Sequence, residues 1–413
     1  MKVLQINVTA NWGSTGHIAE QINLQAQQRG WDTYIAYGRH ATPSKSKLIK
    51  CGSQLQVYEH YAEYCLLDND GLASRLATRK LIREISELKP DIIHLHNIHD
   101  HWLNYKILFD YLNTLGIPIV WTIHDCWAFT GDCCHFTAFG CERWKTGCSQ
   151  SCPYRKSRFC GNFSNRTEEH YKLKKRLFLS TRNLSLVPVS KWLEGVVRDS
   201  FLKEKNIQTI YNGVDTEVFH PLKDTEAVLK KYGLENTRYV MGVATAWSER
   251  KGFPDYCKLA ALIEDDIKIV LVGLNSKKIK EAEKYGIIGI ARTENVLELA
   301  ALYNGASIIL NLSYEETFGL TTVEGFACGT PSIVYNSTAS PELVSPDTGI
   351  IVNPGDVEGI AAAVRRIMEN PAHFTLENCR RRAVENFNKD QQFAKYISLY
   401  KSLLQTINSN ELM

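Results

Sequence analysis

The sequence predicts an α/β protein built from two doubly wound domains, each a parallel sheet covered by helices. The chain has 413 residues, which exceeds the size of one ordinary hydrophobic core. Short β-branched runs alternate with amphipathic helical segments in both halves, which is the pattern of doubly wound domains. Polar residues also follow several of the expected strands, and such domains bind their ligands at those carboxyl ends.

The first half opens with a βα unit. Residues 2–9 predict a buried strand, residues 10–16 a glycine-bearing turn, and residues 17–29 a helix that ends at Gly30. Further strands are expected at 32–37, 91–96 and 118–124. Because parallel strands end at one edge of a sheet, the polar residues at these ends should line a cleft.

A second series of strands begins after residues 207–221, where we place the domain junction. These strands are expected at 239–244, 267–273, 285–290 and 307–312. The terminal segment 391–404 predicts a helix whose apolar face must dock on a domain. That face consists of Phe393, Tyr396, Ile397, Tyr400 and Leu404. We therefore expect one domain of residues 1–205, completed by a terminal helix of about 390–413, and a second domain of residues 206–389.

The segment 313–331 carries the clearest chemistry. Glu316 lies in a predicted loop, and Glu324 lies on a helix predicted for residues 320–328. Backbone amides at this helix start can hold an anion such as a diphosphate, and they belong to Phe318, Gly319, Leu320 and Thr321. Two carboxylates would repel that anion unless they bind hydroxyl groups, so we expect Glu324 on a ribose and Glu316 on a transferred sugar. A capped helix with solvated acids is the alternative.

Composition argues against several classes of function. The 48 basic and 45 acidic side chains leave a net charge of +3, which gives no general argument for nucleic-acid binding. No apolar stretch approaches the roughly 20 residues that span a bilayer. Residues 1–8 are too short and too polar for a signal peptide. We therefore expect the protein in the cytoplasm.

Seven of the twelve cysteines fall within residues 126–160. Clustering in a cytoplasmic chain favours a metal site over disulfides. Residues 130–153 show no helical or alternating run able to bury a core, so a structural Zn²⁺ could order this insertion. The expected ligands are Cys133, Cys141, Cys148 and Cys152. Cys134 could replace the first ligand and Cys160 the last, and free buried thiols or a disulfide are the alternative.

Four motifs occur in order along this chain: Ile210-Tyr-Asn-Gly-Val-Asp-Thr-Glu-Val-Phe219, Arg250-Lys-Gly252, the pair Glu316 and Glu324, and Phe326-Ala-Cys-Gly-Thr-Pro331. Their joint order resembles the retaining GT-B glycosyltransferases of family 4, over nearly the whole chain. Residues 94–104 and 121–131 are similar to a branch of bacterial enzymes that build colanic-acid-type exopolysaccharide and capsule. The resemblance implies two Rossmann-like domains that face a deep interdomain cleft.

The resemblance also implies roles for donor-binding residues. Glu324 would bind the ribose, Glu316 would contact the donor sugar, and the amides of residues 318–321 would hold the distal phosphate. Gly13 in the first turn joins the donor-binding residues. Residues 290–292 would contact the base, although nothing in them distinguishes uracil from guanine.

Two basic residues complete the implied donor site. Lys251 matches the diphosphate lysine of the family and, with Glu316 and His124, is expected to be catalytic. The arginine that usually stands several residues upstream is missing near Thr245, so Arg250 would supply the second positive charge. A solvated pair in a turn is the alternative for Arg250 and Lys251.

Histidines are concentrated at two predicted strand ends. His124 matches the histidine that contacts the donor sugar near its reacting carbon, and a hydrogen-bonded structural role is the alternative. We expect structural roles for His94 and His96. The residues assigned to the acceptor are His99, Asp100 and His101.

The implied reaction moves a hexose-type sugar from UDP or GDP to a glycan or lipid-linked oligosaccharide in bacterial surface polysaccharide synthesis. The acceptor hydroxyl attacks from the front face with retained configuration, and catalysis needs no metal or other cofactor. A covalent scheme with two carboxylates, as in retaining glycosidases, is disfavoured because Glu316 is expected beside the sugar hydroxyls. The donor sugar, the acceptor and the linkage do not follow from the sequence.

Two segments, 154–159 and 172–178, combine basic and apolar residues. Since the acceptor in this family is often lipid-linked, such a face could rest on anionic headgroups at the inner side of the cytoplasmic membrane. A solvated helix face is the alternative.

Two other classes of function compete with the transferase. A nucleotide-sugar epimerase has the same architecture, but residues 212–215 together with Glu316 and Glu324 argue against it. A zinc-dependent binding module for protein or nucleic acid would use the cysteine insertion, and the short basic segments fit it only in part.

Overall fold

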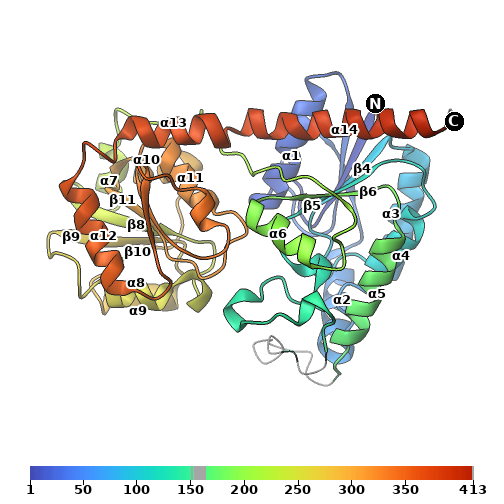
Figure 1. Ribbon diagram of the computed structural model, residues 1–413, viewed down its shortest axis with the longest axis horizontal. Coiled ribbons are helices and arrows are strands. Elements are labelled where there is room, and N and C mark those ends of the chain that lie inside the picture. The colour runs from blue at the N-terminus through green and yellow to red at the C-terminus, as the bar shows by residue number, and fades with distance from the viewer. Residues whose placement is uncertain (150–151, 153–163, 412–413) are drawn as a thin grey trace. The chain divides into compact units, whose positions relative to one another are not determined.

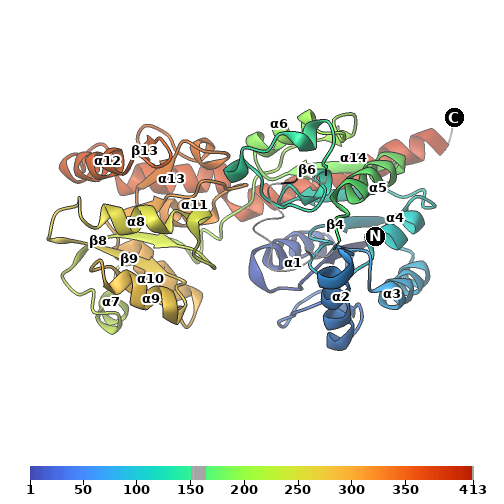
Figure 2. The same cartoon turned by 90° about the horizontal axis from the view of Figure 1, so that it is seen from below.

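The computed structural model describes residues 1–149, 152 and 164–411. Contacts divide the chain into two compact units, drawn as ribbons in Figures 1 and 2. Unit 1 comprises Met1–Tyr211 and Gln392–Met413, and unit 2 comprises Asn212–Gln391. The junctions expected at residues 206 and 390 differ from these limits by a few residues.

Unit 1 is built on a sheet with strand order β3-β2-β1-β4-β5-β6-β7, in which every pair is parallel. Its strands are β1 (Lys2–Asn7), β2 (Asp32–Tyr37), β3 (Lys47–Lys50), β4 (Ile92–Leu95), β5 (Ile119–Ile123), β6 (Leu184–Pro188) and β7 (Asn206–Ile207). Val3 of β1 pairs with Thr33 on one side and Ile92 on the other. The central strands β4, β5 and β6 are buried along their whole length because helices cover both faces of a parallel sheet.

The helices of unit 1 are α1 (Gly13–Gln27), α2 (Gln54–Leu67), α3 (Arg75–Leu88), α4 (Tyr105–Leu112), α5 (Thr167–Ser180), α6 (Lys191–Asp199) and α14 (Lys389–Glu411), which starts in unit 2. On one face of the sheet, Ile22 of α1 and Tyr396 of α14 share a core with Val3. On the other face, Phe178 of α5 packs edge-on against Trp121 of β5. The terminal helix therefore completes the core of unit 1.

Unit 2 is built on a second parallel sheet with strand order β10-β9-β8-β11-β12-β13. Its strands are β8 (Arg238–Val243), β9 (Ile267–Val272), β10 (Ile288–Ile290), β11 (Ile308–Asn311), β12 (Ser332–Tyr335) and β13 (Gly349–Val352). The expected strand at 285–290 starts only at Ile288. The reason is that Tyr285 is half exposed and Gly286 has a positive φ of 70°, so the chain is still turning after a helix.

The helices of unit 2 are α7 (Glu226–Lys231), α8 (Phe253–Leu259), α9 (Ser276–Glu283), α10 (Val296–Gly305), α11 (Leu320–Ala327), α12 (Val357–Glu369) and α13 (Leu376–Phe387). Side chains of α8, α9 and α12 pack on one face, where Tyr256 and Ile360 meet Ile269 and Leu310. The α10 helix lies on the other face, where the Tyr239 hydroxyl of β8 donates to the Leu302 carbonyl at 2.7 Å.

Both sheets contain a point at which the strand order reverses. This point lies between β1 and β4 in unit 1 and between β8 and β11 in unit 2. Doubly wound domains bind ligands just beyond the carboxyl ends of the strands at such points. A ligand is therefore expected at the loops that follow these strands. Among the residues that the structure describes, no helix has the length and apolarity needed to cross a bilayer.

Candidate active site

The carboxyl edge of unit 2 joins the loop after β8 to the loop after β11. The amide of Tyr314 donates to the carbonyl of Arg250 at 2.8 Å, and the Arg250 guanidinium donates to the carbonyl of Glu315 at 3.0 Å. Gly252 permits this approach, since an added Cβ there would lie 2.1 Å from the carbonyl oxygen of Leu312. The two loops thus form one braced surface, and Arg250 is part of the brace.

Lys251 and Glu316 form an ion pair across these loops, between Nζ and Oε1. Both side chains are largely buried, with 20% and 15% of their surface exposed. Burial alone would raise the pKa of Glu316, but the neighbouring Lys251 ammonium outweighs burial and holds that pKa below its usual range. Two residues predicted from sequence to serve one donor are therefore brought into direct contact.

Helix α11 starts at the same edge. Gly319 precedes the helix with a φ of 104°, a backbone conformation that favours glycine. Leu320 is the first helical residue, and Thr322 bonds back to the Gly319 carbonyl at 3.1 Å. The first amides of an α-helix lack intrahelical acceptors, so the helix start presents donors suited to an anion. Phe318 is buried against Phe387, which anchors the entry to this turn.

Glu324 lies on α11 with a partner that the sequence did not indicate. The Tyr303 hydroxyl of α10 donates to Oε2 of Glu324 at 2.8 Å. Burial raises the pKa of Glu324 to about 7, and the hydrogen bond from Tyr303 opposes that rise. The carboxyl group consequently titrates near neutral pH. Its position on the helix behind the amide donors agrees with the sequence prediction, whereas its protonation behaviour was not anticipated.

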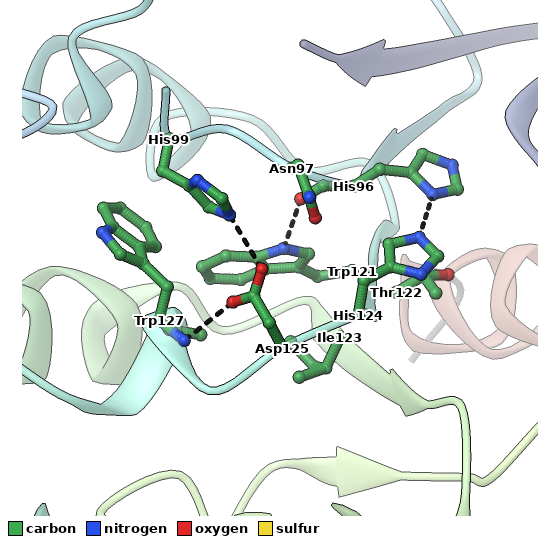
Figure 3. A pocket seen from close by; sticks show the side chains of 10 residues that line it. His96, Asn97, His99, Trp121, Thr122, Ile123, His124, Asp125 and Trp127 are labelled. Carbon is green, nitrogen blue, oxygen red and sulfur yellow. Dashed lines mark hydrogen bonds and ion pairs between the residues drawn. The ribbon is translucent and has the colours of Figure 1, made fainter. Parts of the chain in front are cut away.

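Histidines crowd the carboxyl edge of unit 1 around a pocket (Figure 3). His124 follows β5, and its Nε2 lies 3.0 Å from Nδ1 of His96, which follows β4. Burial lowers the pKa of His124 to about 4, although Asp125 opposes the shift, so the ring is neutral at physiological pH. His94 is fully buried and bonds to Tyr400 of α14 at 2.5 Å and to Thr122 at 2.7 Å.

His99 has the opposite charge state. Its Nε2 lies 2.9 Å from Oδ2 of Asp125, and its Nδ1 lies 3.4 Å from Oδ1 of Asp100. Burial opposes protonation, but the two carboxylates outweigh it and raise the pKa of His99 well above its usual range. Asp125 also accepts the amide of Trp127 at 2.8 Å, which orients the carboxylate (Figure 3). A charged histidine therefore stands beside a neutral one.

The residues predicted to reach the acceptor do not share one environment. His99 lines the pocket, whereas the His101 ring packs on α2 at 4.6 Å from Tyr64 and 5.5 Å from His60. Asp100 and His101 both have positive φ angles, 75° and 63°, so the chain turns sharply after His99. This turn directs His101 away from the group that lines the pocket. Gly13 also has a positive φ, of 66°, at the first position of α1.

The cysteine insertion has more internal packing than the sequence indicated. Phe136 and Trp144 are buried and stack with ring centroids 4.8 Å apart, and Phe129 lies 5.6 Å from Trp144. The expectation that this segment buries no core is therefore wrong. Its aromatic residues are spaced irregularly along short 3₁₀ turns, η1 (Trp127–Phe129), η2 (Thr137–Phe139) and η3 (Arg143–Lys145), so no periodic pattern revealed them.

The predicted zinc ligands gather loosely. Cys133 and Cys148 are buried, and Cys141 and Cys152 are half-buried. Burial raises the pKa of Cys133, and the nearby Cys148 and Cys152 add to that rise. The alternative ligand Cys160 lies outside the described residues.

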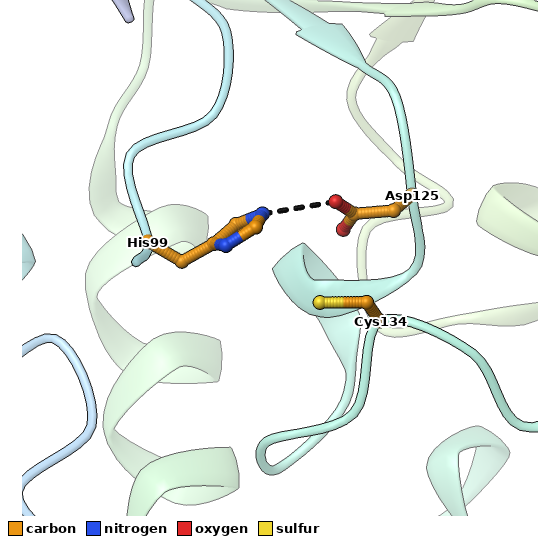
Figure 4. A group of neighbouring side chains, drawn as sticks. All are labelled: His99, Asp125 and Cys134. Carbon is orange, nitrogen blue, oxygen red and sulfur yellow. Dashed lines mark hydrogen bonds and ion pairs between the residues drawn. The ribbon is translucent and has the colours of Figure 1, made fainter. Parts of the chain in front are cut away.

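A different group is tighter. Within residues 1–149, 152 and 164–411, the one cluster of metal-ligand types whose atoms all lie within 4.8 Å of one another is His99, Asp125 and Cys134 (Figure 4). The direct contact between His99 and Asp125 identifies two of its members as an ion pair. The zinc site at the four expected cysteines stays a prediction.

The basic segment 172–178 is not a uniform charged face. Lys174 is fully buried, and its ammonium donates to the carbonyls of Trp127 at 3.0 Å and Gly131 at 2.9 Å. It also lies 3.5 Å from the centre of the Trp127 ring. Lys174 thus holds the start of the cysteine insertion against α5 and is not available to headgroups. The other basic segment, 154–159, lies outside the described residues.

Two family models match this chain. The model for glycosyl transferases group 1 matches residues 224–390, and the model for Glycosyltransferase Family 4 matches residues 13–218. The protein WcaC of Escherichia coli (strain K12), which bears the name of a colanic acid biosynthesis glycosyl transferase, is 24% identical over 98% of this chain and 100% of its own length. N-acetyl-alpha-D-glucosaminyl L-malate synthase of Bacillus anthracis is 28% identical over 49% of this chain and 55% of its own length.

Solved structures share the architecture. Sucrose-phosphate synthase from Thermosynechococcus elongatus aligns with a TM-score of 0.72 at 18% identity, covering 98% of this chain and 99% of the other. Anabaena Alr3699/HepE in complex with UDP-glucose aligns with a TM-score of 0.65 at 15% identity, covering 96% and 99%. The two Rossmann-like units therefore form a GT-B fold. With both family models matched along its length, the chain belongs to the group 1 glycosyltransferases of family 4.

Proposed function

We propose that this glycosyltransferase moves a hexose-type sugar, with retained configuration, from a UDP- or GDP-sugar to a glycan or lipid-linked oligosaccharide in bacterial surface polysaccharide synthesis. The observation that carries the proposal is the pairing of Lys251 with Glu316 beside the start of α11, at the reversal point of the unit 2 sheet. A cation, helix amides and a buried carboxylate are the groups that a sugar diphosphate requires.

Each group at this edge would meet a different part of the donor. The leaving diphosphate gains negative charge as the glycosidic bond breaks, and preorganised donors stabilise such charge more than they stabilise the ground state. Lys251 and the first amides of α11 would supply these donors. Glu316 would then exchange its partner, accepting hydroxyls of the sugar when the phosphate engages Lys251. Glu324 would accept the ribose hydroxyls from behind the helix start.

The names of similar proteins support the same substrate class. WcaC carries a name that places it in colanic acid biosynthesis, and the HepE structure holds UDP-glucose. His124 of unit 1 would contact the sugar, and His99 with Asp125 would contact the acceptor.

A thermal-shift screen tests the donor. Purified protein is melted with UDP-, GDP- and ADP-sugars, and the correct nucleotide at 100 times its dissociation constant should stabilise the fold by about 2.7 kcal/mol. Lys251→Ala should lose this shift, whereas Lys258→Ala, which alters an exposed lysine of α8, should keep it. If no nucleotide sugar stabilised the protein against melting, the proposal would be contradicted.

Product analysis then separates the reaction classes. With the stabilising donor and an oligosaccharide acceptor, NMR of the anomeric proton should show retained configuration in a new glycosidic bond. An isomerised nucleotide sugar formed without an acceptor would instead identify an epimerase.

We also propose peripheral contact with anionic membrane through the basic side chains that α5 exposes, which are Lys172, Lys175 and Arg176. Flotation with vesicles that contain phosphatidylglycerol should carry the protein upward, and less so at high salt. Equal flotation with neutral vesicles would remove the electrostatic contribution.

A further inference from the structure

The hydrogen bonds behind His124 form a chain that runs through three strands of unit 1. Nε2 of His124 lies 3.0 Å from Nδ1 of His96, and Nε2 of His96 lies 2.5 Å from Oε1 of Gln5. Gln5 is in β1, and the histidines follow β4 and β5 (Figure 3 shows both rings). Each link is a nitrogen or oxygen whose proton must be assigned, and the other neighbours decide that assignment.

Backbone carbonyls fix the orientation of the Gln5 amide. Its Nε2 donates to the carbonyl of Ala19 at 2.7 Å and to Oδ1 of Asn23 at 2.7 Å. A carbonyl oxygen can only accept, so the amide atom that faces Ala19 must be the nitrogen. The same logic fixes Asn23, whose Nδ2 donates to the carbonyl of Tyr34 at 3.3 Å. Oε1 of Gln5 therefore faces His96 as an acceptor.

The tautomer of His96 follows from this acceptor. Because Oε1 of Gln5 cannot donate, Nε2 of His96 carries the proton in their hydrogen bond. The ring is fully buried against the rings of His94 and His124, and burial keeps the pKa of His96 well below its usual range. A neutral imidazole protonated at Nε2 has a lone pair at Nδ1. That lone pair must accept a proton from Nε2 of His124.

We infer that Gln5 and His96 are positioning residues that hold His124 as the Nε2–H tautomer, so that Nδ1 of His124 offers a lone pair to a hydroxyl group of the substrate. The half-buried His124 ring lines the pocket of Figure 3, within reach of a ligand. A lone pair accepts from a hydroxyl and repels a phosphate or carboxylate oxygen. That this hydroxyl belongs to a sugar rests on the proposed function, whereas the tautomer does not.

Nitrogen NMR reads the tautomer directly. Protein labelled with ¹⁵N-histidine is studied at pH 7 by two-bond ¹H–¹⁵N correlation, with His124 assigned from the spectrum of His124→Gln. We expect His124 to show a protonated Nε2 and an unprotonated Nδ1. A protonated Nδ1 in the unaltered protein would overturn the inference.

Substitutions test the two positioning residues. Gln5→Met removes the acceptor with little change in size, so His124 should show both tautomers, whereas Gln27→Met in α1, whose amide contacts Thr33 and Lys45, should change nothing. His96→Asn can place an amide oxygen where Nδ1 stood and should keep the His124 tautomer. In His96→Leu, His124 should show both tautomers. A single unchanged tautomer of His124 in that variant would refute the positioning role of His96.

Activity measurements keep this inference separate from the proposed function. In Gln5→Met and His96→Leu, kcat/KM should fall by about 5- to 30-fold, the effect of losing one oriented hydrogen bond, with the circular dichroism melt still cooperative. Gln27→Met should retain its kcat/KM. If His124 shows the expected tautomers but the protein turns over no nucleotide sugar, the positioning role of Gln5 and His96 is supported and the proposed function is contradicted.

Discussion

The carboxyl edges of the two units share a topology and differ in chemistry. Both lie where the strand order of a parallel sheet reverses beside its first strand. In unit 1 the edge carries a neutral His124 next to a charged His99 that Asp125 holds. In unit 2 it carries Lys251 paired with Glu316 at the start of a helix.

This difference shows that the loops, and not the sheets, decide what each edge can bind. A neutral ring with a fixed lone pair suits a hydroxyl group, because the lone pair accepts the hydroxyl proton and the ring carries no positive charge that would hold an anion. A lysine beside helix amides suits a diphosphate, because both supply positive potential. One scaffold thus gives two binding chemistries, and four changes test whether the distinction holds.

The largest effect is expected at the cysteine insertion, which distinguishes unit 1. We propose about one zinc ion per chain, held by Cys133, Cys141, Cys148 and Cys152. Since structural zinc contributes about 10–16 kcal/mol in small peptide sites, Cys148→Ser should lose the metal and expose the insertion to proteases. Cys379→Ser, at a buried cysteine of unit 2, should keep the metal. A zinc content near zero in a protein whose insertion resists proteases would refute the site.

Removal of the cation at the unit 2 edge comes next. Lys251→Ala should fold and yet lose turnover by about 10²- to 10³-fold, because one preorganised donor to the leaving group is gone. Steady-state kinetics with the donor found by thermal shift give the value, and Lys258→Ala is the matched control. Near-normal turnover in Lys251→Ala would end the assignment of unit 2 as the diphosphate edge.

The stability that the pair of His99 and Asp125 gives to unit 1 should depend on pH. The pKa of His99 is raised in the folded state, so its pairing with Asp125 adds stability below the ordinary pKa of histidine and loses it as pH rises through the raised value. Asp125→Asn should therefore cost about 2 kcal/mol at pH 5.5 and less at high pH. Urea unfolding measures this difference.

Asp110→Asn serves as the control for that experiment, because Asp110 forms an exposed pair with Lys106 on α4. It should change stability little at either pH. A cost of Asp125→Asn that does not vary with pH would show that His99 is not charged in the folded protein.

The smallest effect concerns Glu324. Its pKa is raised to about 7, so the carboxylate that would accept ribose hydroxyls is lost as pH falls through that value. Nucleotide affinity should weaken about fivefold from pH 8 to pH 5.5, the difference between charged and neutral hydrogen bonds. Glu324→Gln should bind weakly at both values, and Glu358→Gln on α12 should behave as the unaltered protein. Calorimetric titration would contradict this role if Glu324→Gln kept the pH dependence.

The raised pKa of Glu324 in the folded protein also predicts an effect on stability. A carboxyl whose pKa is raised on folding lowers the stability of the folded state as pH increases from its ordinary pKa to the raised pKa, and the loss is constant above that value. Glu324→Gln should therefore gain relative stability between pH 5 and pH 8. The ionised carboxylate of Glu324 would then lower the stability of the fold and strengthen nucleotide binding.

Local patterns in the sequence were sufficient for the framework. The strand and helix periods predicted the βα alternation of both halves, and the apolar face of residues 391–404 predicted a docked helix, because these signals depend on neighbours along the chain. The motif around Glu316 and Glu324 also predicted a loop followed by a helix start, and α11 begins at the predicted Leu320. Short strands such as β3 and β7 were missed, since four residues or fewer carry little periodicity.

Only the tertiary structure decided the partners of the site residues. Gln5 and His96 stand 91 positions apart, and Tyr303 reaches Glu324 from another helix, so no spacing rule links them. The sequence by itself determined which residue types stand at the strand ends. Burial and cross-strand contacts then set their charge and tautomer, because desolvation and hydrogen bonding act on neighbours in space.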